Sequence, residues 1–451
     1  MGCALTIPDE YRNRCLYHFT HVDNLPGILE HGLLSTNEKK RLGIEHTAIA
    51  YTDIQERRSC MEVPCGCGGV VHDYVPLYFC KRSSMLLAVV NGKIADQQLI
   101  IYFEFPITIM NQYPWVLTDA SANTSRPPNF YDSEADLCNL KWKYIDSPKW
   151  GMPSDSAKQA RQAELLIHKG VDISAVSKII VWNESIKDIV LEAFETAKLP
   201  PSPVGYDEFH YYVDFYDSGK HSIVTGPFLI KKAYQETIDS LLPNIGKAPS
   251  PRYKYLFFLL KNGLRVDFGC LTETVELIGL ETENEVHSED VGTHTLRVVK
   301  ELLQLSEYEG LEKTDKLLVE VAAYLHDIGK GPKSRWASNG GRQKVDPDHP
   351  IKALPMLNRI LAEEIETMKP RSAKVICKLV CYHDLVGDII GKGRRIEELI
   401  DVVEDERELQ MLIALGKADI KAIYPAWSND EKIEAVRQQV IEALESETPD
   451  E

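Results

Sequence analysis

The spacing of apolar residues changes near residue 252, and the change predicts two halves of different architecture. Before it, short apolar runs rich in β-branched and aromatic residues alternate with polar stretches, which predicts strands at 70–79, 99–105 and 177–182. Two amphipathic helices are also expected there, at 22–31 and 185–198. A glycine ends the first helix and a proline pair follows the second.

After residue 252, apolar residues recur at three-and-four spacing, which is typical of amphipathic helices. The pattern predicts an all-α half with helices at 294–305, 315–325, 351–367, 372–383, 395–403, 406–422 and 432–443. Proline-rich stretches near 200 and 250 are typical of domain boundaries. We therefore expect an α+β chain in three parts: a domain over 1–200, a connecting segment over 201–250 and a helical domain over 251–451.

Composition and charge narrow the function classes. Of the 451 residues, 44% are hydrophobic and 26% charged, which is ordinary for a soluble globular protein, and no apolar run is long enough to span a membrane. Ten cysteines without a secretory start predict reduced thiols and a cytoplasmic location. The formal net charge is −17, of which only −4 falls in residues 1–200. This balance argues against tight nonspecific binding of duplex DNA and agrees with a short single-stranded site.

Histidine and aspartate recur in a specific order through the helical half. A bundle could bring these side chains together on one metal centre: His294, His326, Asp327, His349, His383 and Asp419. Imidazole and carboxylate ligands suit Mn²⁺, Fe²⁺, Ni²⁺, Co²⁺ or Mg²⁺. Asp327 could bridge two ions and help to generate a hydroxide that attacks phosphorus. For His349 and His383 the alternative is a solvated histidine at a helix end.

The run AAYLHDIGK at 322–330 closely resembles the core of the HD superfamily of metal-dependent phosphohydrolases. His294 and Asp419 match the first and last ligands of that family. His349 and His383 resemble the additional ligands of its binuclear members. The resemblance covers about 250–440 and implies a divalent metal, with a nucleotide or a phosphodiester as the substrate.

The N-terminal half contains no metal or triad pattern, but three separated motifs stand out. In the first, a strand that bears His18 and Thr20 precedes a helix and a glycine turn, an arrangement that can hold a ribose. The second is IQERR at 54–58, and the third is RQAELLI at 161–167, with Glu164 at the start of an apolar strand. Each has a simpler alternative, such as a core position for His18 or an ion pair with Arg161 for Glu164.

Taken in order, these motifs closely resemble the DarT family, toxins that transfer ADP-ribose from NAD⁺ to a base of single-stranded DNA. The match spans about 15–195. It implies the ADP-ribosyltransferase fold, a split, mixed β-sheet that clasps NAD⁺, and modification of thymidine or guanosine. It also implies a toxin or phage-defence role with an antitoxin as a partner. One departure is Ser84, where the family usually has a proline, at a distance from the glutamate motif.

The resemblance gives catalytic roles to Glu164 and Arg57, with the neighbouring Arg58 left open as the alternative. A carboxylate beside C1′ stabilises the oxocarbenium character that forms when the nicotinamide–ribose bond breaks. Because an arginine is always protonated, we expect it to orient the substrate and stabilise charge rather than remove a proton. The residues expected to bind NAD⁺ are His18, Thr20, Asn24 and Gly27.

The polar stretch 119–153 is long for a loop within a compact domain, which is typical of a functional segment. Trp115, Trp142 and Trp150 lie in or beside it and offer aromatic faces for an unpaired base, although packing is the simpler interpretation.

The sequence thus predicts an NAD-dependent DNA ADP-ribosyltransferase fused to an HD phosphohydrolase. The alternative is an HD phosphohydrolase whose N-terminal half senses NAD or ADP-ribose without transferring it. The two hypotheses differ in the need for Glu164, because a sensor that only binds has no use for that carboxylate.

Overall fold

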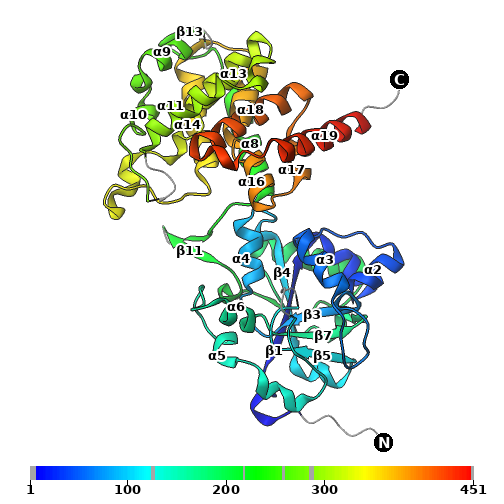
Figure 1. The fold of residues 1–451 in the computed structure, drawn as a ribbon. Coiled ribbons are helices and arrows are strands. Elements are labelled where there is room, and N and C mark those ends of the chain that lie inside the picture. Colours follow the sequence, from blue (N-terminus) through cyan, green and yellow to red (C-terminus); the bar gives the residue numbers. More distant parts are fainter. Residues whose placement is uncertain (1–6, 123–126, 217–218, 256–259, 284–288, 448–451) are drawn as a thin grey trace, which may run out of the picture. The chain divides into compact units, whose positions relative to one another are not determined.

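The computed structural model describes residues 7–122, 127–216, 219–255, 260–283 and 289–447. The chain divides into two compact units, Met1–Gly226 and Pro227–Glu451 (Figure 1). The segment 201–250, which the sequence analysis treats as a connection, is therefore divided between them. No helix of the described residues combines the length and apolarity that crossing a membrane requires.

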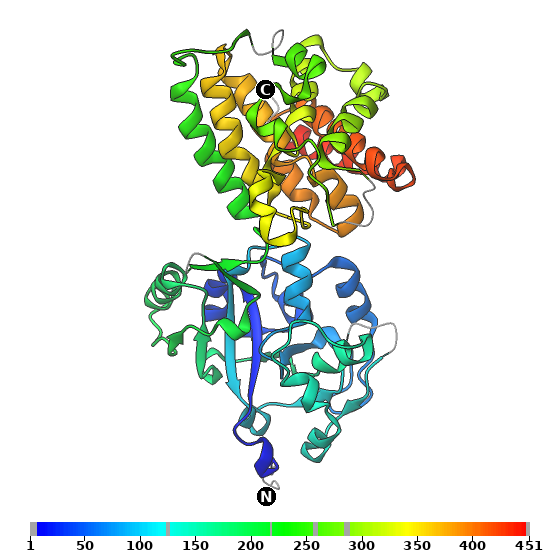
Figure 2. The ribbon, with the colours of Figure 1, turned by 90° about the vertical axis from the view of Figure 1, so that its left-hand side faces the viewer.

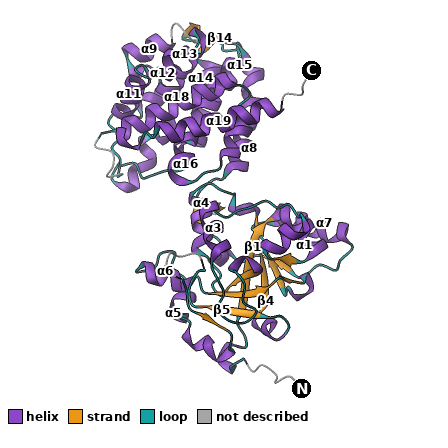
Figure 3. Ribbon diagram, turned by 45° about the vertical axis from the view of Figure 1, so that its right-hand side comes forward, coloured by secondary structure: helices purple, strands orange, loops and turns teal. Residues whose placement is uncertain are grey.

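The first unit is built on one eight-stranded mixed sheet (Figure 3). Its strands, in spatial order, are β10 (Val204–Gly205), β9 (Lys178–Ile180), β4 (Ile100–Pro106), β1 (Cys15–His21), β3 (Tyr74–Tyr78), β7 (Glu164–His168), β5 (Trp115–Thr118) and β6 (Phe130–Tyr131). The pair β10–β9 is parallel and the other neighbours are antiparallel. The three predicted strands are confirmed, although β3 is shorter than 70–79 because a 3-10 turn precedes it.

Both helices predicted for the first unit are present. The first is a 3-10 turn at Val22–Asn24 followed by α1 (Leu25–His31), which Gly32 ends with a φ of 79°, and the second is α7 (Glu184–Ala197). Five other helices of this unit were not predicted: α2 (Thr36–Leu42), α3 (Thr52–Cys60), α4 (Ser84–Asn91), α5 (Trp142–Ile145) and α6 (Asp155–Arg161). Two of these, α2 and α3, are mostly polar and so show little apolar periodicity.

The second unit is helical, as predicted. Its helices are α8 (Pro227–Leu241), α9 (Lys261–Val266), α10 (Thr272–Val275), α11 (Val291–Leu302), α12 (Ser306–Glu309), α13 (Lys313–Leu325), α14 (His349–Glu363), α15 (Pro370–Cys381), α16 (Leu385–Lys392), α17 (Ile396–Val402), α18 (Glu406–Ile423) and α19 (Asp430–Glu447). Figure 2 shows α8, α14 and α15 side by side in the green-to-gold part of the colour scale. The prediction of a helix over 351–367 is wrong at its end, because β14 (Ile365–Thr367) pairs with β13 (Tyr253–Tyr255).

The register of the sheet fixes where Glu164 lies. As the first residue of β7, it is opposite Tyr78, the last residue of β3, and Thr118, the last residue of β5. Because all three positions lie at the same edge of the sheet, segments that leave these strands meet around Glu164. The polar stretch 119–153 starts directly after β5, at this edge.

Candidate functional site

The four residues expected to bind NAD⁺ line one pocket of about 730 Å³ in the first unit. His18 and Thr20 are two residues apart on β1, so that their side chains project from the same face of the sheet. Gly27 lies on α1, and a Cβ built on it would have no atom within 4 Å. The pocket is therefore open at Gly27, and its size is within the range of small-molecule sites.

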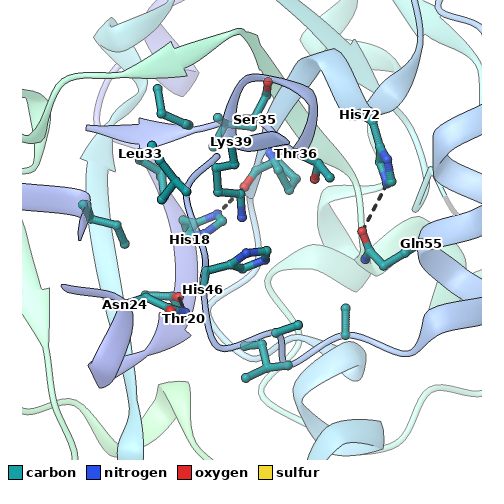
Figure 4. A pocket seen from close by; sticks show the side chains of 18 of the residues that line it. His18, Thr20, Asn24, Leu33, Ser35, Thr36, Lys39, His46, Gln55 and His72 are labelled. Carbon is teal, nitrogen blue, oxygen red and sulfur yellow. Dashed lines mark hydrogen bonds between the residues drawn. The ribbon is translucent and has the colours of Figure 1, made fainter. Parts of the chain in front are cut away.

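The hydrogen bond of His18 determines which ring nitrogen faces a ligand. Its Nδ1 lies 2.9 Å from the carbonyl oxygen of Pro76, and a carbonyl oxygen only accepts, so Nδ1 carries the hydrogen. Burial lowers the pKa of His18 to about 4, which keeps the ring neutral at pH 7. Nε2 is then an acceptor, the group that a ribose hydroxyl requires (Figure 4).

Asn24 lies in the same pocket, but its amide is used within the protein. Its Oδ1 accepts from Thr47 N at 2.7 Å, and its Nδ2 donates to Thr47 O and to Thr20 Oγ1, both at 2.9 Å. Both amide hydrogens are therefore engaged. This geometry makes Asn24 a residue that orients Thr20 and holds the segment after α2 against the pocket.

A cationic side chain that the sequence analysis did not consider also lines this pocket. Lys39, on α2, lies with His18 and His46 on one side of the pocket, while His72 and Gln55 lie on another (Figure 4). Burial lowers the pKa of Lys39 to about 8, and within the described chain its ammonium group has no ion-pair partner. An unpaired, partly desolvated ammonium suits a phosphate ligand.

Glu164 is fully buried and forms a bidentate ion pair with Arg58. Arg58 Nη1 and Nη2 each donate to one carboxylate oxygen at 3.1 Å, and Ser121 Oγ donates to Oε1 at 3.4 Å. Burial alone would lower the pKa of Arg58, but Glu164 outweighs burial and raises it. Arg58 also lines the pocket that holds His18, so the ion pair joins Glu164 to that pocket.

The structure does not bring Arg57 to Glu164. Its side chain is 47% exposed and pairs with Asp53 one helical turn earlier, at 3.1 Å, on the surface of α3. Arg58, the neighbour left open by the sequence analysis, holds the position beside the carboxylate. Successive residues of a helix point about 100° apart, so only one of the two arginines can face the sheet edge.

We expect these two arginines to differ sharply in their effect on ADP-ribose transfer. Arg58→Gln should lower the initial rate at least about a hundredfold, because it removes a desolvated charge at the reacting centre. Arg57→Gln makes the same charge change at an exposed position and should lower the rate less than about threefold. Incorporation of radiolabelled ADP-ribose into an oligonucleotide measures both, and the reverse ranking would contradict the assignment.

The three tryptophans differ in what they can offer a base. Trp115 is buried and donates to Met110 O, and Trp142 stacks on Tyr11 at 5.1 Å between ring centroids. Packing is therefore the role of both rings in this structure. Trp150 is 40% exposed, which leaves an aromatic face toward solvent.

In the second unit, all six predicted metal ligands come together. Donor atoms within 4.8 Å of one another form three overlapping groups: His294, His326 and Asp327; Asp327, His349 and His383; and His383, Asp384 and Asp419. Asp327 and His383 each belong to two groups, so the arrangement can hold more than one ion. Asp384 was missed in the sequence, although its place directly after His383 was a usable signal.

The hydrogen bonds of three histidines leave one nitrogen of each for a metal. His326, His349 and His383 each donate Nδ1–H, at 2.8 Å, to the carbonyl oxygen three residues earlier. Their Nε2 atoms face the centre, and those of His349 and His383 lie 3.1 Å apart. Two acceptor lone pairs at this distance repel each other unless a cation binds between them. Such backbone support is usual for metal-ligating histidines.

Other observations also fit a cation at this centre. His326 Nε2 and Asp327 Oδ1 are buried without a hydrogen-bond partner among the described residues. Burial alone would lower the pKa of His326, but the carboxylates of Asp327 and Asp419 outweigh burial and raise it to about 9. The centre thus strongly favours positive charge. Lys330 donates to Asp327 Oδ2 at 2.7 Å and supplies part of it.

Gly329, in the AAYLHDIGK run, allows the segments that carry Asp327 and His349 to approach each other closely. A Cβ built on it would overlap the carbonyl oxygen of His349 and the backbone nitrogen of Ala353. Only glycine therefore allows the turn after Asp327 to lie directly against the first turn of α14, where His349 is located.

Known proteins resemble this chain in two separate segments. Residues 17–213 match a family model described as "ssDNA thymidine ADP-ribosyltransferase, DarT", and residues 291–417 match the model of the HD domain. A DNA ADP-ribosyl transferase of Thermus sp. (strain 2.9) is 35% identical over 183 residues, which are 39% of this chain and 85% of that protein. A DNA ADP-ribosyl transferase-DNA ADP-ribosyl glycohydrolase fusion protein of Thermosipho africanus is 26% identical over 247 residues, 54% of this chain and 63% of that protein.

Among solved structures, Thermus sp. 2.9 DarT in complex with ADP-ribosylated ssDNA is 31% identical, with a TM-score of 0.41 over 47% of this chain and 100% of that one. The two family models and the Thermus relative define the class of protein: a DNA ADP-ribosyltransferase unit is followed by a unit of the HD phosphohydrolase family. The chain belongs to the DarT family, and it carries an HD domain in its C-terminal half. The alternative of a non-transferring sensor is not favoured.

Proposed function

We propose that the first unit transfers ADP-ribose from NAD⁺ to thymidine in single-stranded DNA. The observation that carries this proposal is the buried Arg58–Glu164 pair at the edge of a pocket large enough for NAD⁺. The description of the matching family supports thymidine over guanosine. The names of the relatives support DNA as the acceptor.

In this proposal, Glu164 stabilises the positive charge that develops at C1′ as nicotinamide leaves. Arg58 orients the carboxylate and, as substrates enter, the reacting groups. His18 accepts a hydrogen bond from a ribose hydroxyl, Thr20 donates one, and Gly27 leaves room for the ligand. Asn24 supports Thr20 from behind.

Mass spectrometry of a short thymidine-containing oligonucleotide tests the proposal. After incubation with the full chain and NAD⁺, we expect a mass increase of one ADP-ribose, and fragmentation should locate it on a thymidine. An unchanged oligonucleotide would contradict the proposal. Binding of NAD⁺ with no turnover would instead support the sensor alternative.

Lys39 gives NAD⁺ binding a predicted dependence on pH. Its pKa is lowered to about 8 by burial, so the ammonium is charged below that pH and attracts the pyrophosphate. We expect the Kd for NAD⁺ to be constant up to about pH 7 and to rise up to about tenfold by pH 9.5 as the charge is lost. Calorimetric titration across this range measures the effect.

The matched control for this prediction is Arg41→Gln, an exposed position on the same helix whose guanidinium pairs with Glu38. This variant should keep the wild-type pH profile. Lys39→Gln should bind NAD⁺ at all pH values about as weakly as the wild type does at pH 9.5. If the Kd for NAD⁺ still rises above pH 8 in Lys39→Gln, another group is responsible for the pH dependence.

We also propose that the second unit hydrolyses a phosphoester with divalent metal ions at its His–Asp centre. Three observations support this role. The donor atoms of the histidines and aspartates cluster in groups that can each hold an ion, His326 Nε2 and Asp327 Oδ1 are buried without a hydrogen-bond partner among the described residues, and the HD family model matches. When bound, the metal supplies an activated water and neutralises phosphate charge. In this role, Asp327 and the histidines hold the ions, and Lys330 keeps Asp327 ionised. From the ligand chemistry, the suitable metals remain Mn²⁺, Fe²⁺, Ni²⁺, Co²⁺ or Mg²⁺.

A toxin role, in which an antitoxin or phage infection controls the transferase, follows from the proposed reaction. A bulky, charged adduct on a template base blocks base pairing, so uncontrolled transfer would stop replication. Growth after induced expression of the whole chain tests this role. Normal growth despite modified DNA in the cells would contradict it.

A further inference from the structure

A second cavity of about 400 Å³ in the first unit has an unusual charge balance. It shares no lining residue with the pocket that holds His18. Four cationic side chains line it together with a single carboxylate, that of Asp146: Arg14, Lys81, Arg82 and Arg161. A cavity with this excess of positive charge suits an anion.

Carboxylates of the described residues neutralise only two of the four cations. Arg14 forms a bidentate pair with Asp146 at 2.8 and 2.9 Å, and Lys81 pairs with Asp207 at 2.8 Å. The exposed fractions of Arg82 and Arg161 are only 8% and 2%, yet neither has a carboxylate within ion-pair distance among the described residues. Their uncompensated charges oppose folding, and a bound anion would offset that cost.

The hydrogen bonds of these two arginines are incomplete. Arg82 donates to the carbonyl oxygens of Pro148 and Glu208 at 3.3 and 3.5 Å, and Arg161 donates to Lys149 O at 2.6 Å. The Nε atoms of both are buried with no partner in the described structure. Burial lowers the pKa of Arg82, and the charge of Arg161 lowers it further. The cavity wall therefore holds two guanidinium groups with unused donors.

The cavity lies at the edge of the sheet where Glu164 is located. Arg82 follows β3, whose last residue Tyr78 is opposite Glu164, and Arg161 precedes Glu164 by three residues. Two of the segments that line the cavity therefore meet the reacting centre at one edge. A DNA strand that presents a base to Glu164 must pass this edge.

Exposed aromatic rings beside the cavity distinguish a nucleic acid from a small anion. Phe209 lines the cavity and is 57% exposed, and Trp150, 40% exposed, has its ring centre 5.9 Å from the Arg82 guanidinium carbon. Cationic grooves with adjacent aromatic faces are the usual sites for single strands, because phosphates pair with the cations and bases stack on the rings.

We propose that this cavity binds one phosphodiester group of the single-stranded DNA substrate through Arg82 and Arg161. A neighbouring base stacks on Trp150, with the exposed ring of Phe209 beside it. This site rests on the proposed transferase function and adds to it a contact that fixes the register of the strand relative to Glu164.

The test measures binding of the full chain to a labelled oligonucleotide without NAD⁺, by fluorescence anisotropy. A series of oligonucleotides carries one neutral methylphosphonate linkage at successive positions. For the wild type, one position should raise the Kd about tenfold. Arg82→Gln should bind the unmodified strand about tenfold more weakly and lose nothing further at that position, since the two changes remove the same contact.

Further measurements separate this site from general charge effects. The slope of log Kd against log salt should become shallower by about 0.7 in Arg82→Gln, the value for one phosphate contact of a single strand. Lys158→Gln, an exposed lysine of α6 paired with Asp155, should behave as the wild type. Trp150→Ala should weaken binding about tenfold, and the Kd for NAD⁺ should be unchanged in every variant.

Several outcomes would overturn the site. One is a methylphosphonate linkage that raises the Kd equally in Arg82→Gln and the wild type. Another is weaker NAD⁺ binding with unchanged DNA binding in Arg82→Gln, which would assign the cavity to the dinucleotide. If Arg82→Gln does not fold, Arg161→Gln, at the other proposed phosphate-binding side chain, replaces it, and an unchanged Kd for DNA in that variant overturns the site. If transfer occurs without these effects on DNA binding, the proposed function holds and the phosphate site does not. If these effects occur without transfer, the phosphate site holds and the proposed function does not.

Discussion

Replacing Glu164 by glutamine is expected to lower ADP-ribose transfer to DNA at least about a thousandfold while NAD⁺ still binds. Glutamine preserves the size of the side chain but removes the negative charge that faces the developing oxocarbenium ion, and such electrostatic contributions are among the largest in catalysis. Because Glu164 is joined to the pocket through its ion pair with Arg58, ground-state binding of NAD⁺ depends little on its charge, and the Kd for NAD⁺ should stay within about threefold. Mass spectrometry gives the transfer rate, and calorimetry gives the Kd.

Glu164→Gln also removes the ion pair with Arg58, which lowers stability, and a double variant separates this effect from the effect on transfer. Glutamine at position 164 leaves the Arg58 guanidinium buried without a counter-charge, a loss of about 3–5 kcal/mol in the free energy of unfolding. Combining Arg58→Gln with Glu164→Gln replaces the pair by two neutral amides and should restore much of the Tm. It should not restore transfer. Recovery of activity together with Tm would mean that Glu164 acts only through stability.

The sequence predicted the elements with strong apolar periodicity and missed those without it. Helices such as α11 and α18 bury a continuous apolar stripe, which the three-and-four spacing reveals. In α3 the only large aliphatic residue is Ile54, so the pattern predicts neither the helix nor the face that it turns to the sheet. The end of the helix predicted over 351–367 depends on pairing with β13, about 110 residues earlier, which local patterns cannot show.

The same limits apply at the candidate site. Choosing between Arg57 and Arg58 requires the rotational phase of α3, which its polar sequence does not provide. The HD ligands could be predicted because their residue types are distinctive and their order resembles that of a known family. By contrast, Arg82 and Arg161 lie about 80 residues apart in ordinary contexts, and only the folded sheet brings them to one cavity. The proximity of two like charges that are so far apart in the sequence is a property of the tertiary structure.

Replacing Asp327 by asparagine is expected to lower the metal content of the full chain below about a tenth of the wild-type value. Asp327 belongs to two of the three ligand groups, with Oδ2 3.4 Å from His326 Nε2 and Oδ1 3.2 Å from His349 Nε2. Asparagine removes the negative charge and presents an NH₂ group, which cannot bind a metal ion, toward one of these sites. Elemental analysis by mass spectrometry measures the metal bound per chain, and hydrolysis of a chromogenic phosphodiester should be lost in parallel.

Two further variants test whether the loss of metal follows the number of ligand groups to which the replaced residue belongs. Asp384→Asn removes a carboxylate that belongs to only one ligand group and should lose only part of the metal, whereas Asp401→Asn, an exposed position paired with Lys231, should lose none. ADP-ribose transfer should be unchanged within about twofold in all three, because Arg58 and Glu164 lie in the other compact unit. Wild-type metal content in Asp327→Asn would contradict the centre. Loss of transfer along with metal would instead show that the HD centre controls the transferase, a coupling that two independent sites do not produce.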